Sequence, residues 1–311
     1  MASKISEETN ALCFRVLART AWYISRAACP LAAFVMSLQT LHATAAAFAR
    51  TAPMPVLFVG HGSPMNALED NAFTRRLRRV GEDLRRRQPP AAILVVSAHW
   101  LTRGTFATLN ERPRTIHDFG GFPQALFDMQ YPAPGAPALV HELLAQVPDV
   151  HGTHEWGLDH GTWTVLHHLF PAADVPVFQL SLDATKPLEW HFDFARQLRF
   201  LRERGVLIVG SGNVVHNLRQ SMPKLMAGDA TPYDWAVEFV EWFKSHLVSG
   251  NYRALADYTK AGASGPLAVP TLDHYLPTLY TLGLAGPHEP VQQLFEEVSF
   301  GGLGMRTFMV G

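Results

Sequence analysis

From residue 55 to the C-terminus, short apolar runs alternate with longer segments whose apolar residues recur at helical spacing. The runs that predict strands are residues 56–59, 92–97, 175–180 and 206–209. The segments that predict helices are residues 69–88, 136–146, 163–169, 190–204 and 232–247. Because the runs are apolar throughout, they are typical of strands buried on both faces. The sequence therefore predicts a single α/β domain over residues 55–311, with a central mostly parallel or mixed sheet covered by helices on both faces.

The C-terminal part of the chain is less regular. Residues 251–263 predict a short helix that ends in a loop rich in glycine and serine. The tail, residues 298–310, is interrupted by glycines and has a strand-like pattern. We expect this tail to return to the edge of the sheet.

The charge balance argues against a nucleic-acid partner. Lysine and arginine number 26 and aspartate and glutamate 27, so the net charge is −1 and no basic field exists to hold a phosphate backbone. One basic cluster, residues 75–87, has Val80 and Leu84 interleaved at helical spacing. This pattern predicts a solvated helix face.

The first 54 residues form an N-terminal extension outside the α/β pattern. Arginines precede an apolar stretch at residues 27–36, and small residues follow at 43–47, which is the order of a secretory signal. The charged, polar start is atypical of such a signal, and the alternative is an extension from an early start codon. The apolar stretch is short and interrupted, so we expect no stable membrane partner. We expect a cytoplasmic location, or a periplasmic one if the extension acts as an export signal.

Cysteine and histidine usage restricts the chemistry. Both cysteines, Cys13 and Cys29, lie in the extension, so residues 55–311 contain no disulfide framework, thiolate metal site or cysteine nucleophile. The chain has 15 histidines, a surplus for this length. Any metal ion in this domain must therefore use nitrogen or oxygen ligands, and imidazoles are abundant.

Three histidines follow predicted strands. His61 follows residues 56–59, His99 follows residues 92–97, and His216 follows the strand at 206–209. In an open α/β sheet, the carboxyl ends of the strands form the crevice in which ligands bind, so these side chains should converge. A single histidine after a strand is most often bonded locally. His61 differs because the glycines on both sides of it imply close approach of another group.

Two further histidines are candidates. His274 lies beside Asp273, and His160 follows Asp159. The structural alternative for His160 is that Asp159 simply caps a helix beginning near Thr162. Other motifs are missing: the chain has no Walker A sequence and no Gly-x-Ser-x-Gly elbow, and Ser63 suits a turn better than a nucleophile.

The histidines do not select one metal. Neutral imidazoles suit Fe(II), Zn(II) or Cu(II). Two histidines with one carboxylate would indicate non-haem iron, whereas the fourth candidate here is His274, with only Asp273 adjacent. This favours zinc without excluding iron.

Six motifs, in order from about residue 55 to the C-terminus, resemble those of one family. They are Gly60-His61-Gly62-Ser63-Pro64-Met65, Ser97-Ala98-His99-Trp100, Thr115-Ile116-His117-Asp118-Phe119-Gly120-Gly121-Phe122-Pro123, Leu158-Asp159-His160-Gly161-Thr162-Trp163, Gly210-Ser211-Gly212-Asn213-Val214-Val215-His216-Asn217 and Asp273-His274-Tyr275. Together they resemble the DOPA-dioxygenase-type branch of the class III (LigB-like) extradiol ring-cleavage dioxygenases. The extension 1–54 lies outside the resemblance.

The resemblance implies roles for these residues. His61, His99 and His274 resemble metal-site residues, and His216 resembles a residue described both as a metal-site residue and as an acid/base. His160 resembles a histidine near substrate and oxygen. Residues implied to belong to the loop over the substrate are His117, Phe119 and Phe122.

The implied activity is the opening of a catechol, DOPA or a related diphenol, by O2 to a muconic semialdehyde. The implied cofactor is one divalent metal ion per chain, Zn²⁺ or Fe²⁺. Iron passes electrons readily, whereas zinc cannot change its oxidation state. A zinc-dependent hydrolase and a non-catalytic binding member of the fold are the alternatives. The sequence leaves the particular catechol and the oligomeric state open.

Overall fold

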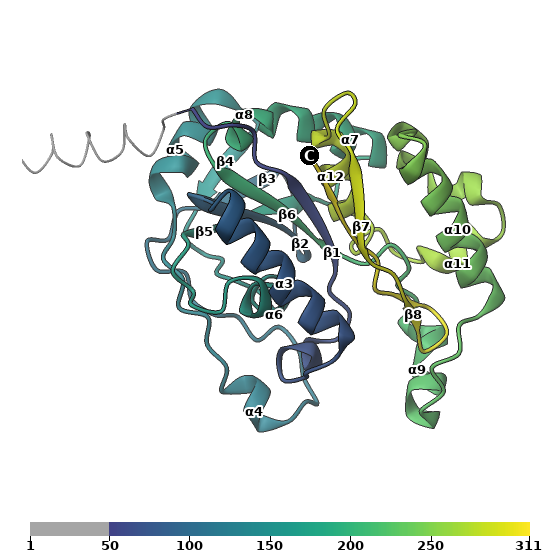
Figure 1. Ribbon diagram of the computed structural model, residues 1–311. Coiled ribbons are helices and arrows are strands. Elements are labelled where there is room, and N and C mark those ends of the chain that lie inside the picture. Colours follow the sequence, from purple (N-terminus) through teal and green to yellow (C-terminus); the bar gives the residue numbers. More distant parts are fainter. Residues whose placement is uncertain (1–49) are drawn as a thin grey trace, which may run out of the picture. The chain divides into compact units, whose positions relative to one another are not determined.

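A computed structural model describes residues 50–311, which form one compact unit (Figure 1). The predicted extension, apart from its last five residues, lies outside the described part of the chain. Residues 51 and 54 already contact the folded unit, since their backbone N–H groups donate to the carbonyls of Glu203 and Arg202. The strands of the main sheet, in spatial order, are β4 (Val150–Thr153), β3 (Thr105–Thr108), β5 (Val177–Asp183), β2 (Ala92–Thr102), β6 (Val206–Gly212), β1 (Val56–Gly60), β10 (Thr307–Val310) and β7 (Val291–Phe295).

The centre of the sheet is parallel and its flanks are mixed. Strands β5, β2, β6 and β1 run parallel to one another, whereas β10 is antiparallel to both β1 and β7. On the other flank, β3 is parallel to β4 and antiparallel to β5. The predicted mostly parallel or mixed sheet is confirmed. The carboxyl ends of β1, β2 and β6 consequently lie side by side.

Helices cover both faces of this sheet (Figure 1). One face is covered by α3 (Ala72–Arg87) and α6 (His160–Leu169), which pack on the apolar side chains of β1, β2 and β6. The other face carries α12 (Leu276–Leu284) and α7 (Leu188–Ala195). A Cβ on Gly210 of β6 would lie 2.5 Å from the Pro277 carbonyl, so this glycine lets α12 approach closely.

The remaining elements connect these layers or flank them. They are η1 (Pro64–Ala67), α4 (Gln124–Phe127), α5 (Pro137–Gln146), η2 (Arg196–Leu198), α8 (Arg199–Arg202), α9 (Leu218–Ala227), α10 (Asp234–Val248), η3 (Tyr252–Ala256), η4 (Tyr258–Ala261), α11 (Ser264–Ala268), β8 (Val298–Ser299) and β9 (Leu303–Gly304). Within residues 50–311, no helix combines the length and the apolar character needed to cross a bilayer.

The structure corrects several predicted elements. The tail does not lie at the edge of the sheet, because β10 inserts between β1 and β7. Residues 190–204 are not one helix but the succession α7, η2 and α8, and residues 251–263 form two 3-10 helices, η3 and η4, instead of a short α-helix. Strand β2 continues to Thr102, so His99 lies within the strand and not after it.

Candidate metal centre

His61 lies one residue beyond β1 and is almost completely buried. Its backbone N–H donates to the Gly212 carbonyl at the end of β6, and Gly62 turns the chain away with a φ of +64°. The Nδ1 atom of His61 lies 2.9 Å from the Ser211 hydroxyl, and that hydroxyl donates to the Gly161 carbonyl at 2.5 Å. Because the single proton of Ser211 is used there, Nδ1 of His61 is the donor and Nε2 keeps a free lone pair.

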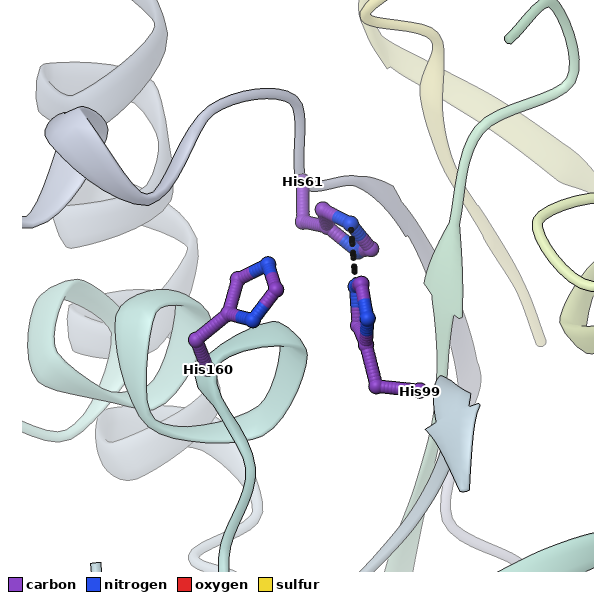
Figure 2. A group of neighbouring side chains, drawn as sticks. All are labelled: His61, His99 and His160. Carbon is purple, nitrogen blue, oxygen red and sulfur yellow. Dashed lines mark hydrogen bonds between the residues drawn. The ribbon is translucent and has the colours of Figure 1, made fainter. Parts of the chain in front are cut away.

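His99 projects from an irregularity in β2. Val96 pairs with Leu180 and Leu101 pairs with Leu182, so the intervening residues of β2 exceed those of β5 and bulge out of the ladder. The Nε2 atom of His99 lies 3.2 Å from Nε2 of His61, as Figure 2 shows. A Cβ on Gly161 would lie 2.8 Å from the His99 ring, so this glycine leaves room for the ring.

His160 is the first residue of α6 and faces the same centre (Figure 2). Its backbone N–H and its Nδ1 atom both lie 2.9 Å from Oδ1 of Asp118. The other oxygen of Asp118 lies 3.5 Å from Nδ1 of His99. Burial raises the pKa of Asp118, but the bonds from His160 outweigh this and leave the pKa below its usual value. The carboxylate therefore orients the His160 ring by accepting from its Nδ1 atom, and its other oxygen faces the His99 ring.

The alternative prediction that Asp159 caps a helix is also confirmed. Its side chain accepts the Thr162 N–H as the cap of α6. The cap does not exclude a functional His160, since capping by Asp159 is what places His160 at the helix start.

His216 and His274 complete the group from the other side. Their rings stack with centroids 3.5 Å apart and an interplanar angle of 9°. The His274 ring lies 5.2 Å from that of His61 and 5.0 Å from that of His99, centroid to centroid. Nδ1 of His274 donates to Asp273 at 2.5 Å, which leaves its Nε2 free.

The donor set fits a metal ion. Two groups have ligand atoms that lie within 4.8 Å of one another: His61, His99 and His160, and His216, Asp273 and His274. Two nitrogens that share one ion at about 2.1 Å with tetrahedral angles lie about 3.4 Å apart, close to the observed separation of the Nε2 atoms of His61 and His99. The rings could therefore hold one ion between them.

Burial and mutual repulsion keep His61, His99 and His216 neutral, the form that binds metals. Burial and then the neighbouring histidines hold the pKa of His61 well below its usual value. The same causes lower the pKa of His99. Burial, followed by the neighbouring His274, lowers the pKa of His216 to about 3.

The predicted substrate loop lies beside this centre. The ring of Phe119 meets the His160 ring edge-on with centroids 5.5 Å apart, and Phe122 packs on Phe119 at 5.3 Å. His117 does not contact the histidine centre directly. Its Nε2 atom donates to the Met129 carbonyl at 3.0 Å, and its ring packs near Trp163. The structure thus brings together His61, His99, His160, His216 and His274, with Phe119 against them and His117 behind.

Two residues that shape the centre were not predicted. Asp118 belongs to one of the six motifs. Its distance along the chain from His99 and from His160, however, gives no indication that it contacts their rings. Ser211 was hidden in a glycine-rich strand end. A polar residue between two glycines at the end of a buried strand was the only signal available for it.

Fold and site together define an α/β protein whose strand-end histidines could hold a metal ion. A family model for the catalytic LigB subunit of aromatic ring-opening dioxygenase matches residues 50–307. The chain is 49% identical over 264 residues to a protein of Escherichia coli (strain K12) named 4,5-DOPA dioxygenase extradiol, covering 83% of this chain and 95% of that protein. A protein of Beta vulgaris with the same name is 33% identical over 240 residues, covering 76% of this chain and 88% of its own length.

A solved structure agrees with this assignment. The crystal structure of uncharacterized protein JW3007 from Escherichia coli K12 superposes with a TM-score of 0.71 at 42% identity, covering 83% of this chain and all of that one. The chain belongs to the LigB family of aromatic ring-opening dioxygenases.

Proposed function

We propose that this protein is an extradiol dioxygenase that opens a catechol, DOPA or a related diphenol, with O2 to a muconic semialdehyde. The observation that supports this most is the convergence of five histidines at the carboxyl ends of β1, β2 and β6, in a chain of the LigB family. The names of the relatives from Escherichia coli and Beta vulgaris point to the same reaction.

The proposed ligands of one divalent ion, Fe²⁺ or Zn²⁺, are His61, His99, His216 and His274. Bound Fe²⁺ would supply electron transfer between catechol and dioxygen, a chemistry that Zn²⁺ lacks. The chain contributes the orientation of the ligands: Ser211 holds His61 through its Nδ1 atom, and Asp273 holds His274 in the same way.

His160 is the proposed acid/base beside the substrate. Its Nδ1 atom donates to Asp118, so its Nε2 atom is free to take a proton from a catechol hydroxyl. His216 is a second candidate for this role, because its ring stacks on that of His274 at the same centre. Phe119 and Phe122 would exclude water and pack on the ring of the substrate.

Reconstitution tests the proposal. The purified protein is loaded with Fe²⁺ under nitrogen, mixed with catechols and then exposed to air. We expect O2 uptake in a one-to-one ratio with a yellow ring-opened product. The same protein loaded with Zn²⁺ should give neither. Full iron occupancy without product from any diphenol would refute the proposal, and hydrolysis of esters by the zinc form would favour the hydrolase alternative.

The dual role of His216 can be resolved with His216→Ala. If His216 is a ligand, metal stoichiometry and affinity fall together with turnover; if it is an acid/base, turnover falls while metal stays bound. Metal content by atomic emission and O2 uptake on the same sample separate the two.

We also propose that residues 55–311 are the catalytic domain and residues 1–54 an extension. N-terminal sequencing of the protein from its native source would reveal cleavage, and a periplasmic location would require it. An intact Met1 would refute the export signal.

A further inference from the structure

A cavity of about 720 Å³ lies between the C-terminal end of α12 and the segments α7–α8 and α10–η3 (Figure 1). We call it the arginine cavity. None of the five histidines of the metal centre lines it. His274 precedes the first turn of α12, whereas the cavity is lined by the last turn of that helix. Because nine helical residues span about 14 Å, the arginine cavity is separate from the histidine centre.

Three arginines from three elements line this cavity: Arg196 of η2, Arg199 of α8 and Arg253 of η3. The guanidinium carbons of Arg196 and Arg253 lie 5.4 and 5.7 Å from the centre of the Phe192 ring, which also lines the cavity. Arg253 donates to both oxygens of Asp193, and Nη1 of Arg196 lies 3.7 Å from one of them. One carboxylate therefore serves two guanidinium groups.

Arg199 is held by backbone carbonyls instead of a carboxylate. Its Nε atom donates to the Leu284 carbonyl at 3.3 Å and its Nη2 atom to the Ala285 carbonyl at 2.6 Å, at the end of α12. Arg199 thus covers the negative end of the helix dipole, which would otherwise repel an anion. Within residues 50–311, Nη1 of Arg199, Nε of Arg253 and the Tyr252 hydroxyl have no hydrogen-bond partner. These donors are free to bind a ligand.

The lining carries an excess of positive charge. Its carboxylate, Glu289, is held through both oxygens by the buried Arg202 at 2.7 and 2.9 Å. With the ion-pair partners included and His288 counted as neutral, four arginines face two carboxylates, which leaves a formal charge of +2. The whole chain has a net charge of −1, so this excess is local.

Part of the wall is apolar. Val248, at the end of α10, lines the cavity and is 65% exposed. Pro287, Pro290 and Tyr252 line it as well. The volume lies in the range of sites for small organic molecules and exceeds what a single oxyanion needs. A ligand with a charged end and an apolar or aromatic body would use both parts of the lining.

We propose that the arginine cavity binds an organic anion whose charged end carries two negative charges, as a phosphate or a pair of carboxylates, on an apolar or aromatic body. A dianion balances the formal charge of +2. The planar guanidinium groups match the oxygens of either group, and the Tyr252 hydroxyl adds a neutral donor. Binding here does not depend on the proposed dioxygenase activity.

Calorimetry on the full chain tests the proposal with four compounds: inorganic phosphate, phenyl phosphate, phthalate and phenol. We expect phenyl phosphate or phthalate to bind with a dissociation constant of about 1 mM or lower, inorganic phosphate to bind more weakly, and phenol not to bind measurably. Added salt should weaken the binding. Higher affinity for phenyl phosphate identifies a phosphate as the charged end, and higher affinity for phthalate identifies a dicarboxylate.

An oxyanion could also coordinate a metal ion at the histidine centre. The titrations are therefore made with and without bound Zn²⁺, and the affinities should agree.

Variants locate the binding. Arg196→Gln combined with Arg253→Gln keeps polar side chains at two exposed positions and should weaken binding of phenyl phosphate roughly tenfold or more. Arg219→Gln, an exposed arginine of α9 outside the cavity, is the matched control and should change nothing. Val248→Glu adds a carboxylate to the lining from an exposed helix position and should also weaken binding. Melting temperatures of all variants verify that the fold is kept.

The absence of saturable binding by every anionic compound overturns the proposal. Unchanged affinity in both the double arginine variant and Val248→Glu also overturns it, because the anion would then bind elsewhere. Phenol bound as tightly as phenyl phosphate would show that charge is not recognised, with the same consequence. None of these outcomes depends on ring cleavage, so the cavity and the proposed function are tested separately.

Discussion

Ser211 stands between His61 and the backbone of α6, with its proton directed at the Gly161 carbonyl. This arrangement determines which nitrogen of His61 has a free lone pair for a metal ion. A serine hydroxyl with its proton already used can only accept, so it stabilises the tautomer with the proton on Nδ1. Metal affinity should therefore depend on a residue that never touches the metal.

For Ser211→Ala, we expect metal affinity to fall roughly tenfold or more, since loss of such a supporting bond typically costs this much. The free energy of unfolding should fall by about 1–3 kcal/mol, because the buried Nδ1–H of His61 loses its acceptor. Competition with a chelator measures the affinity. Ser249→Ala, at an exposed turn, is the control. Unchanged affinity in Ser211→Ala would contradict the tautomer argument.

Gly161 lies inside α6, where alanine would ordinarily stabilise a helix by about 1 kcal/mol. Here the added Cβ would lie 2.7 Å from the Ser97 hydroxyl and 2.8 Å from the His99 ring. We expect Gly161→Ala to displace His99 and reduce metal binding despite the better helix propensity. Gly120→Ala, whose Cβ would meet nothing within 4 Å, should bind metal normally. Equal affinities for the two variants would show that His99 has room to move.

At the scale of elements, α7 and α12 share a buried polar contact. Nδ1 of His191 on α7 lies 3.1 Å from the Tyr280 hydroxyl on α12, and His191 is fully buried. Burial lowers the pKa of His191 from 6.5 to about 4, although the carboxylate of Asp183 opposes the effect. Between these two values the unfolded chain binds a proton that the folded protein does not. Stability should therefore fall as the pH drops from about 6.5 to about 4.

The variant His191→Gln should remove part of this pH dependence. Gln stays neutral and still offers a partner to Tyr280, so the difference in the free energy of unfolding between pH 7 and pH 4.5 should shrink by as much as about 3 kcal/mol. Urea unfolding at several pH values measures it. Tyr280→Phe keeps the buried imidazole and should keep the slope. An identical pH profile for wild type and His191→Gln would be inconsistent with this account.

The sequence predicted the central elements because their patterns are local. Strands β1, β2, β5 and β6 are apolar runs, and α3 alternates its buried and basic residues at helical spacing. Strands β3 and β4 and helix α12 were missed. Two of these are only four residues long, and α12 is buried along its whole length, so no amphipathic period marks it.

The site was predictable in part for a related reason. Histidines predicted at the ends of buried strands indicate convergence, which identified His61, His99 and His216 from one sequence, although His99 lies within β2. His274 and His160 depended more on family resemblance. The bulge that turns His99 out of β2, and the contacts of Asp118 with two rings, depend on the pairing of distant segments and leave no local pattern.

At the scale of the whole molecule, the last strand completes the sheet. Strand β10 separates β1 from β7, and its Phe308 and Val310 side chains are fully buried. Phe308 also stacks on Phe58 of β1 with centroids 5.3 Å apart. The segment leading into β10 contains Leu303 and Met305, which adjoin the histidine centre. The end of the chain thus serves both the sheet and the site.

Deletion of residues 307–311 should lower the stability of the fold far more than the loss of five residues would suggest. Loss of the two buried side chains alone costs about 3–6 kcal/mol, and β7 also loses its partner. We expect a large drop in the melting temperature, measured by circular dichroism, together with loss of metal binding. Deletion of Gly311 alone should leave both nearly unchanged. Cooperative melting of the longer deletion near the wild-type temperature would contradict this role.

The position of β10 also bears on how the protein is made. Strand β1 leaves the ribosome before its antiparallel partner β10, which lies about 250 residues further along the chain, a delay of roughly ten to fifty seconds at ordinary elongation rates. During that interval one edge of β1 has no partner from its own chain, and such an edge invites pairing with other chains. Translation products that stop before β10 should consequently aggregate rather than accumulate as partly active enzyme, so the site is completed only when β10 has been made.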